Sequence, residues 1–331
     1  QGDPGRMIGV FRSPGALMPG STGNQDLIAT KHAFSALGSR CVVEVCGADA
    51  VAGATAVAMA LAEVERIERK YSRYDPHSFL SEINRVALTA GAVEVDDETA
   101  DLLDYAAACH ALSEGRFDIT AGLLRRAWNF ASGRLPEADA VAALLARIGW
   151  DRLAWRRPVL RFTVPDMEID LGGIGKEYAV DRVASLLLDA GFAHGVVDLG
   201  GDMAILGPHP DGSAWRIGLR HARRPDALAA ELSVMRGCIA TSGDYERCIE
   251  IDGTRYSHLL DPRTGWPVTG LASVTALAGS CMVAGSLSSI AMLKGSDGIP
   301  WLAGLSVPHW CADTEGRASG FLPQLIDLPP G

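Results

Sequence analysis

The sequence has no Cys-x-x-Cys pair, although its 331 residues include seven cysteines. This absence excludes the usual spacing of zinc sites and of thioredoxin-like redox sites. The cysteines are Cys41, Cys46, Cys109, Cys238, Cys248, Cys281 and Cys311. Most of them stand in apolar strings, which is typical of buried thiols that act as small hydrophobic side chains. We therefore assign them no catalytic role.

The chain also lacks an excess of positive charge and any long apolar run. Thirty basic and 40 acidic side chains give a formal net charge of −10. A broad cationic surface for nucleic acid or for anionic lipid is thereby excluded. No apolar run reaches the ~20 residues of a membrane-spanning helix, and the segment 1–6 has neither the basic start nor the apolar run of a signal peptide. We expect no membrane span and no nucleic-acid partner.

What the chain does have is enough apolar residues for a large core, at 48% of the total. Residues 1–31 are rich in Gly, Pro and Ser, so we predict a flexible leader there and a single two-lobed domain over 32–331. Helical spacing after a strand at 41–46 predicts a helix that ends before the Asp75-Pro76 turn. Asp96 or Asp97 can cap a second helix that runs to about Ser113.

Two further helices and a run of short strands complete the expected pattern. Pro136 suits the first position of the third helix, and Gly191 can close a fourth that starts near Lys176. Short β-rich segments, punctuated by Gly, Pro and Asp, predict antiparallel strands. They are 195–199, 203–207, 215–220, 231–235, 247–251, 255–260 and 273–278. Strands and helices do not alternate evenly, so we predict an α+β fold.

The segment DLGGIGKEYAVD, from Asp170 to Asp181, runs from a strand end through glycines into a predicted helix that carries Lys176. Glycine lets backbone amides approach an anion at a helix N-terminus, and lysine adds positive charge. The segment is neither a Walker loop nor a dinucleotide fingerprint. Taken alone, it fits a phosphate site or an ordinary turn equally well.

Three more segments combine turn residues with groups that can do chemistry. They are DLGGD (198–202), TSGDY (241–245) and HLLDPRTG (258–265). In the last of these, His258 stands three residues before Asp261, a spacing compatible with an acid/base pair. The Asp-Pro step and the following glycine also favour a plain turn, and each segment by itself permits both interpretations.

In this order, the segments resemble those of the FAD:protein FMN transferases, the ApbE-like family, over residues 33 to 306. The segments ALGS (36–39), YSRYDPHSFLSEIN (71–84) and FDITAGLLRRAWNF (117–130) complete the likeness. The resemblance implies a T-fold-like architecture of antiparallel sheets flanked by helices, with two lobes around a cofactor cleft. Family members commonly work outside the cytoplasmic membrane, which implies a periplasmic or exported protein; a cytoplasmic location is the alternative.

The resemblance implies FAD contacts at particular positions of this chain. In such proteins an aromatic residue in the segment that matches YSRYDPHS stacks on the flavin, and here it is Tyr74. The other implied contacts are Leu37, which replaces the usual methionine, Phe117, Asp118, Thr120, Asp170, Lys176, Thr241, Ser242 and His258. His258 and Asp261 are the implied catalytic residues.

The family's reaction moves FMN from FAD to a threonine of a partner protein and releases AMP. It needs a base near the threonine hydroxyl and positive charge on the pyrophosphate, normally from magnesium. The resemblance assigns the metal ligands here to the Gly173 carbonyl and to Ser289, which replaces a threonine.

One metal ligand of the family is missing. Family members carry an aspartate where this chain has Gly285 in AGSLSS (284–289), so we expect magnesium to be held weakly or not at all. On this basis, Gly285→Asp is expected to increase magnesium-dependent turnover. Glu177 stands where the family usually has glycine, and it is either a substitute ligand or a solvent-facing helix residue.

Three functions remain open on the sequence alone. The chain is an FMN transferase, a catalytically weak protein that binds or supplies FAD, or an FAD pyrophosphatase that uses water as the acceptor. The sequence names neither the acceptor protein nor an oligomeric state.

Overall fold

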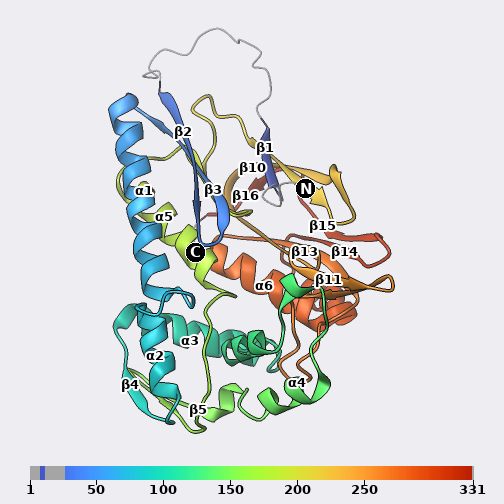
Figure 1. The fold of residues 1–331 in the computed structure, drawn as a ribbon. Coiled ribbons are helices and arrows are strands. Elements are labelled where there is room, and N and C mark those ends of the chain that lie inside the picture. Colours follow the sequence, from blue (N-terminus) through green and yellow to red (C-terminus); the bar gives the residue numbers. More distant parts are fainter. Residues whose placement is uncertain (1–7, 12–26, 330–331) are drawn as a thin grey trace.

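A computed structural model describes residues 8–11 and 27–329, and it contains one extended antiparallel sheet covered by helices (Figure 1). The main path of the sheet has the order β15-β14-β13-β10-β8-β7-β3-β2. Off this path, β9 and β16 pair with β10, and β1 pairs with β9. Its strands are β1 (Ile8–Phe11), β2 (Ile28–Ala36), β3 (Ser39–Gly47), β7 (Gly195–Leu199), β8 (Asp202–Gly207), β9 (Trp215–His221), β10 (Arg224–Gly243), β13 (Leu271–Ala278), β14 (His309–Asp313), β15 (Ala318–Phe321) and β16 (Ile326–Asp327). All these pairings are antiparallel except that of β10 with β16.

The long strand β10 joins two parts of this sheet. Its first half pairs with β9, from Leu228 to Val234, and its second half lies between β8 and β13, from Cys238 onward. The second half ends in the TSGDY segment. A single strand thus carries that segment from the sheet toward the helices.

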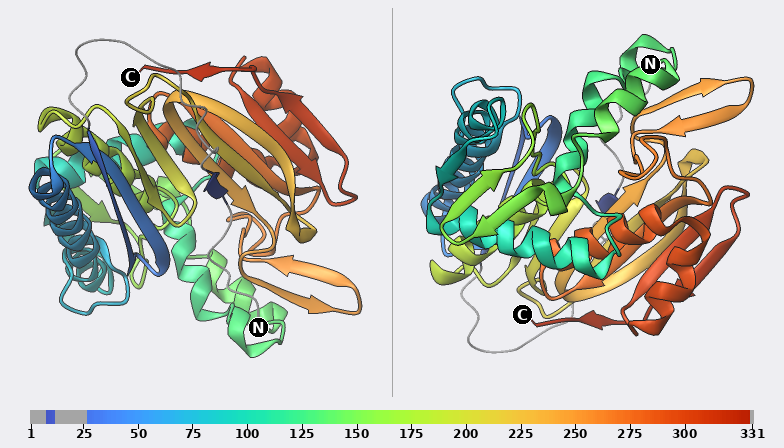
Figure 2. Two further views of the ribbon diagram at one scale, coloured as in Figure 1. Left: turned by 90° about the horizontal axis from the view of Figure 1, so that it is seen from above. Right: turned by 90° about the horizontal axis from the view of Figure 1, so that it is seen from below.

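Three helices pack against the sheet: α1 (Ala50–Tyr71), α5 (Gly175–Asp189) and α6 (Cys281–Lys294). The helix α1 contacts β2 and β3, α5 contacts β7 and β8, and α6 contacts β10 and β13. Figure 2 shows the strands running from β2 at one end to β15 at the other. The short helix α7 (Gly298–Gly304) packs against α6 and β15.

The pairing of α5 with α6 positions much of the candidate site. Asp181 of α5 accepts hydrogen bonds from the backbone N–H groups of Cys281 (2.6 Å) and Met282 (2.9 Å) and from the Ser280 hydroxyl (2.7 Å). A carboxylate at a helix N-terminus satisfies amides that have no partner within the helix. One side chain of α5 therefore fixes the start of α6.

The remaining segment, residues 79–162, forms a second layer below the sheet in the view of Figure 1. Its helices are α2 (Phe79–Ala87), α3 (Asp97–Leu112) and α4 (Ala138–Leu145), with 3₁₀ turns at Ile119–Arg126, Phe130–Ser132 and Trp150–Arg152. A small sheet has the order β4-β6-β5, from Ala92–Glu94, Val159–Phe162 and Leu153–Arg156. A separate hairpin, β11 (Cys248–Ile251) with β12 (Thr254–Ser257), leads into HLLDPRTG.

The α+β architecture with antiparallel sheets is confirmed, whereas several boundaries differ from the sequence prediction. The strand β2 begins at Ile28, inside the predicted leader, and Ile8–Phe11 pairs with β9, while most of the leader lies outside the described residues. Asp96 caps α3 as expected, through a hydrogen bond from the Thr99 N–H (2.9 Å). Pro136 precedes α4 by two residues. In residues 27–329, no helix is both long and apolar enough to cross a membrane.

Candidate functional site

The glycine loop between Asp170 and α5 is tied to the lower layer. Asp170 accepts a hydrogen bond from the Gly172 N–H (2.9 Å) and its own N–H donates to the Ile119 carbonyl (2.8 Å). Its carboxylate also pairs with the Arg73 guanidinium. A Cβ at Gly173 would lie 3.1 Å from the Phe117 ring. The structure thus brings Phe117, Asp170 and Gly173 together, and their roles toward FAD and magnesium remain predictions.

Arg73 links this loop to Tyr74. The guanidinium lies 4.9 Å from the Tyr74 ring centroid and donates to the Tyr74 hydroxyl (2.8 Å). Burial raises the pKa of Tyr74, but its hydrogen bond from Arg73 and the nearby Arg247 outweigh burial, so the net shift is downward. The ring itself is 72% exposed. Tyr74 is therefore an oriented aromatic surface that a planar ligand can contact.

Asp118 and Thr120 are buried parts of the scaffold. The Asp118 carboxylate accepts hydrogen bonds from the Thr120 N–H (2.8 Å), the Thr120 hydroxyl (2.6 Å) and the Trp150 N–H (2.8 Å). The Thr120 hydroxyl in turn accepts from the Gly149 N–H (2.8 Å). With these oxygen atoms used internally, the two residues connect the 3₁₀ turn at Ile119–Arg126 to Gly149 and Trp150.

We predict that Asp118→Ala lowers the free energy of unfolding by about 3 kcal/mol, because three buried donors lose a charged acceptor. Chemical denaturation measures this change. The matched control is Asp211→Ala, which removes a similar short-range acceptor, bonded to the Ser213 N–H (2.9 Å), from an exposed loop. We expect the control to cost less than about 1 kcal/mol. Equal costs for both variants would contradict the scaffold role.

Lys176 stands at the start of α5 and pairs with Asp202 of the DLGGD turn. Burial lowers the pKa of Lys176, but the Asp202, Glu177 and Glu246 carboxylates outweigh burial and raise it well above its usual range. Asp202 is also placed to accept a hydrogen bond from the Thr241 N–H (3.3 Å). Three of the sequence-predicted segments therefore meet around one charged lysine.

Glu177 and Gly285 interlock between α5 and α6. A Cβ on Gly285 would lie 2.9 Å from Oε1 and 3.0 Å from Cδ of Glu177, and closer still to its Cγ. Glu177 is 7% exposed, so its prediction as a solvent-facing helix residue is wrong. Burial and the Asp202 carboxylate raise the pKa of Glu177 to about 8. Its Oε2 is buried without a hydrogen-bond partner.

A cluster of serine hydroxyls lies beside this contact. The Ser242 hydroxyl is 2.8 Å from that of Ser288 and 3.0 Å from that of Ser289. Ser288 also donates to the Gly285 carbonyl (2.9 Å). The TSGDY segment and α6 thus present neighbouring hard oxygen atoms.

His258 follows β12, and its surroundings keep the imidazole neutral. Burial and the positive charge of Arg247 lower the pKa of His258 to about 4, and its backbone N–H donates to the Arg247 carbonyl (3.0 Å). Nδ1 is buried without a hydrogen-bond partner. A neutral imidazole at neutral pH can accept a proton.

Asp261 does not form the expected pair with His258. Its carboxylate accepts hydrogen bonds from the Arg263 N–H (2.9 Å) and from the Arg263 guanidinium. Its carbonyl accepts from the Gly265 N–H (2.7 Å). DPRTG is therefore a turn stabilised by its aspartate, as one of the two sequence interpretations had it. The carboxylate that acts on His258 is that of Asp244, which offsets part of the downward shift in the pKa of the imidazole.

Leu37 lies in the turn between β2 and β3, where its N–H donates to Glu68 of α1 (2.9 Å). The neighbouring strand register and the hydrogen bond from the Gly200 N–H to the Arg40 carbonyl (3.1 Å) place this turn beside DLGGD. Leu37 is therefore close to the Lys176 end of the site, and its contact with FAD remains a prediction.

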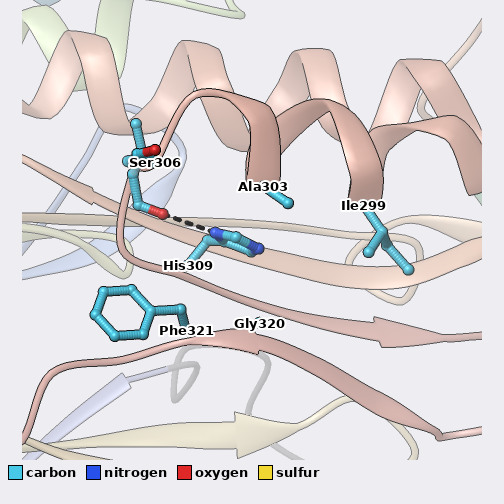
Figure 3. Close-up of a pocket in the computed structure, with 7 residues that line it drawn as sticks. Ile299, Ala303, Ser306, His309, Gly320 and Phe321 are labelled. Atoms are coloured by element: carbon cyan, nitrogen blue, oxygen red, sulfur yellow. Dashed lines mark hydrogen bonds between the residues drawn. The ribbon is translucent and has the colours of Figure 1, made fainter.

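A pocket of about 460 Å³ lies elsewhere, between α7 and the strands β14 and β15 (Figure 3). It is lined by Ile299, Ala303, Ser306, Val307, His309, Gly320 and Phe321. The His309 Nδ1 is engaged with the Val307 carbonyl at 2.7 Å. Without a Lys or Arg side chain in its lining, this pocket does not suit a pyrophosphate, and we place the site at the glycine loop.

The residues near Gly285 fit a small, hard cation. Magnesium prefers oxygen ligands, and this place offers an unpartnered carboxylate oxygen with neighbouring hydroxyls. No cluster of three or more His, Cys, Asp or Glu side chains suited to a metal occurs among the described residues. A metal here would therefore be bound by few protein groups, with the remaining positions left for water or phosphate.

Sequence reasoning missed three charged residues of the site: Arg73, Asp202 and Arg247. Arg73 and Asp202 stand inside quoted segments, and Arg247 follows TSGDY by two residues. Their positions in or beside these motifs could have identified them as candidate site residues. Their partners, however, come from distant segments that only the fold brings close.

Comparisons with known proteins show the family to which the chain belongs. The family model described as "ApbE family" matches residues 37–308. An FAD:protein FMN transferase of Klebsiella pneumoniae is 30% identical over 85% of this chain and 84% of its own length, and one of Vibrio cholerae is 32% identical over 71% and 72%.

Solved structures show the same fold. The crystal structure of the ApbE protein of Thermotoga maritima superposes with a TM-score of 0.81 at 30% identity and covers 89% of this chain and 97% of its own. The flavin transferase ApbE of Vibrio cholerae gives a TM-score of 0.79 at 26% identity over 89% and 97%. The match with the family model, the sequence identities and the common fold together show that this chain belongs to the ApbE family.

Proposed function

We propose that this protein transfers FMN from FAD to a threonine hydroxyl of an acceptor protein and releases AMP. The observation that carries the proposal is that a neutral His258, whose buried Nδ1 has no hydrogen-bond partner, lies near the cationic groups of Arg73 and Arg247 next to the glycine loop. Relatives named as FAD:protein FMN transferases support the reaction type.

The chemistry assigns separate tasks to separate residues. The threonine oxygen attacks the FMN-side phosphorus, the bond from that phosphorus to the bridging oxygen breaks, and AMP leaves with that oxygen. His258 takes the threonine proton as its general base. Lys176 and the amides at the start of α5 stabilise negative charge on the pyrophosphate.

A bound magnesium ion would neutralise charge that develops on the phosphate oxygens. The Gly173 carbonyl and Ser289 are the neutral oxygens that the family resemblance assigns to it. The aspartate that the family carries is replaced here by Gly285. The buried carboxylate of Glu177, next to that glycine, is a candidate ligand in its place.

The proposal is tested by AMP release from FAD. Purified protein with FAD and magnesium should release AMP faster when cell extract that contains an acceptor is added. Equal release with and without extract would instead identify an FAD pyrophosphatase. FAD binding without any release would identify a catalytically silent FAD-binding protein. An exported location stays a prediction from the resemblance.

Tyr74→Ala is predicted to weaken FAD binding about threefold to tenfold. An aromatic contact contributes about 0.5–1.5 kcal/mol beyond the burial of its area. Quenching of flavin fluorescence measures the dissociation constant. The matched control is Phe321→Ala, an aromatic residue that is 60% exposed and lines the distant pocket. If Tyr74→Ala binds FAD as tightly as the control does, Tyr74 is not a flavin contact.

A further inference from the structure

The contact between Glu177 and Gly285 joins two of the positions at which this chain differs from the family pattern that the resemblance implies. In the family pattern, glycine stands at the position of Glu177 and aspartate at that of Gly285. In this chain the carboxylate is on α5 and the glycine on α6. The volume that a side chain at position 285 would enter already holds Cγ, Cδ and Oε1 of Glu177. The two differences are therefore coupled. The carboxylate occupies the same volume, but it is attached to α5 instead of α6.

The exchanged carboxylate has an atom that the protein leaves without a partner. Glu177 is buried, and its Oε2 makes no hydrogen bond. A buried polar atom without a partner costs free energy, so such atoms are rare in folded proteins unless a ligand or ion uses them. Lys176, the preceding residue, pairs with Asp202 and does not satisfy this oxygen.

Neutral oxygen atoms surround the same stretch of α6. Ser289 lies one helical turn after Gly285, and residues four apart share a helix face. The Ser289 hydroxyl is within 3.0 Å of the Ser242 hydroxyl, and Ser288 donates to the Gly285 carbonyl. Carboxylate, hydroxyl and carbonyl oxygens are the ligand types of magnesium, with water and substrate phosphate as its usual additional ligands.

We propose that Glu177 is the carboxylate ligand of a divalent cation in this protein and that it replaces the missing aspartate from the opposite helix. The inference rests on the proposed function only for the identity of the cation as magnesium. It predicts that the chain binds the cation in spite of Gly285.

The test is cation binding, measured separately from turnover. Mn²⁺, a spectroscopic substitute for magnesium, is titrated into FAD-saturated protein and followed by electron paramagnetic resonance, with FAD alone as the blank. Glu177→Gln keeps the side-chain volume over Gly285 and removes the ability to offer an anionic oxygen to a cation. We expect it to weaken Mn²⁺ binding about tenfold or more.

Two further variants separate ligation from general electrostatics. Glu246→Gln removes another carboxylate that acts on Lys176, and we expect Mn²⁺ affinity to change less than about twofold. The double variant Glu177→Gly with Gly285→Asp returns the carboxylate to α6. We expect it to bind Mn²⁺ within a few-fold of the wild type, whereas Glu177→Gly alone loses binding.

The inference is overturned if wild-type protein binds no Mn²⁺ beyond the FAD blank, or if Glu177→Gln binds it as tightly as the wild type. Failure of the proposed function gives a different pattern. Protein that binds Mn²⁺ through Glu177 but leaves FAD intact would support the inference and contradict the transferase. If the wild-type protein transfers FMN and Glu177→Gln binds Mn²⁺ as tightly as the wild type, the transferase is supported and the inference is contradicted.

Discussion

Replacing His258 with glutamine is expected to slow AMP release and FMN transfer by about 10²- to 10⁴-fold, the usual contribution of a general base. Glutamine has no basic nitrogen, so it cannot take the threonine proton. FAD affinity should change little, because the expected defect is in the chemical step. Single-turnover AMP release from enzyme-bound FAD measures that step directly.

The wild-type pH profile gives a second test of the same role. Burial and Arg247 lower the pKa of His258 to about 4, so the basic form of His258 is fully present at neutral pH and is lost as the pH falls toward that value. The rate should therefore fall only in the acidic range, and no step attributable to this group is expected near its ordinary pKa.

The control for both tests is His32→Gln, which changes an exposed histidine on the edge strand β2. It should leave the rate and its pH dependence unchanged. Wild-type-like single-turnover rates in His258→Gln would remove His258 from the chemistry.

Gly285→Asp alone is expected to lower the free energy of unfolding by about 3 kcal/mol or more, from overpacking and from a second buried carboxylate. The structure thus reverses the expectation from sequence that this substitution restores activity. Its Cβ would meet Glu177 near the root of that side chain, where a change of rotamer gives little relief. Chemical denaturation measures the loss.

A glycine in open surroundings provides the matched control. No atom lies within 4 Å of a Cβ built on Gly304, at the end of α7, so Gly304→Asp should cost less than about 1 kcal/mol. Adding Glu177→Gly to Gly285→Asp should recover most of the lost stability, because the two positions are in contact and their effects are not additive. Equal costs for Gly285→Asp and Gly304→Asp would contradict the interlocked geometry.

Local signals were sufficient for the start of α3 and for the end of α5. Asp96 accepts from the Thr99 N–H, as an N-cap should, and Gly191 follows α5 with a positive φ of 89°. The helix α6 was not predicted, since its AGSLSS stretch combines small and polar residues without an amphipathic period. Its position depends on contacts with β10, β13 and α5, which are distant in sequence.

The residues of the candidate site likewise fall into those that local sequence predicted and those that it did not. The motif order pointed to the glycine loop, to Lys176 and to His258, because those residues stand next to turn-forming glycines and prolines. The internal role of Asp118 was not visible, since the Trp150 N–H that donates to its carboxylate belongs to a residue 32 positions later in the sequence. The burial of Glu177 was missed because its environment is set by a glycine 108 positions later.

The most direct test of the proposed transferase is mass spectrometry of the acceptor. Extract from cells that lack the gene for this chain is incubated with purified protein, FAD and magnesium, and proteins that remain fluorescent after denaturation are digested and sequenced. The account predicts a peptide in which one threonine carries FMN through a phosphoester bond, formed by the wild type and not by His258→Gln. Complete conversion of FAD to free FMN and AMP, with no modified threonine in any protein, would contradict it.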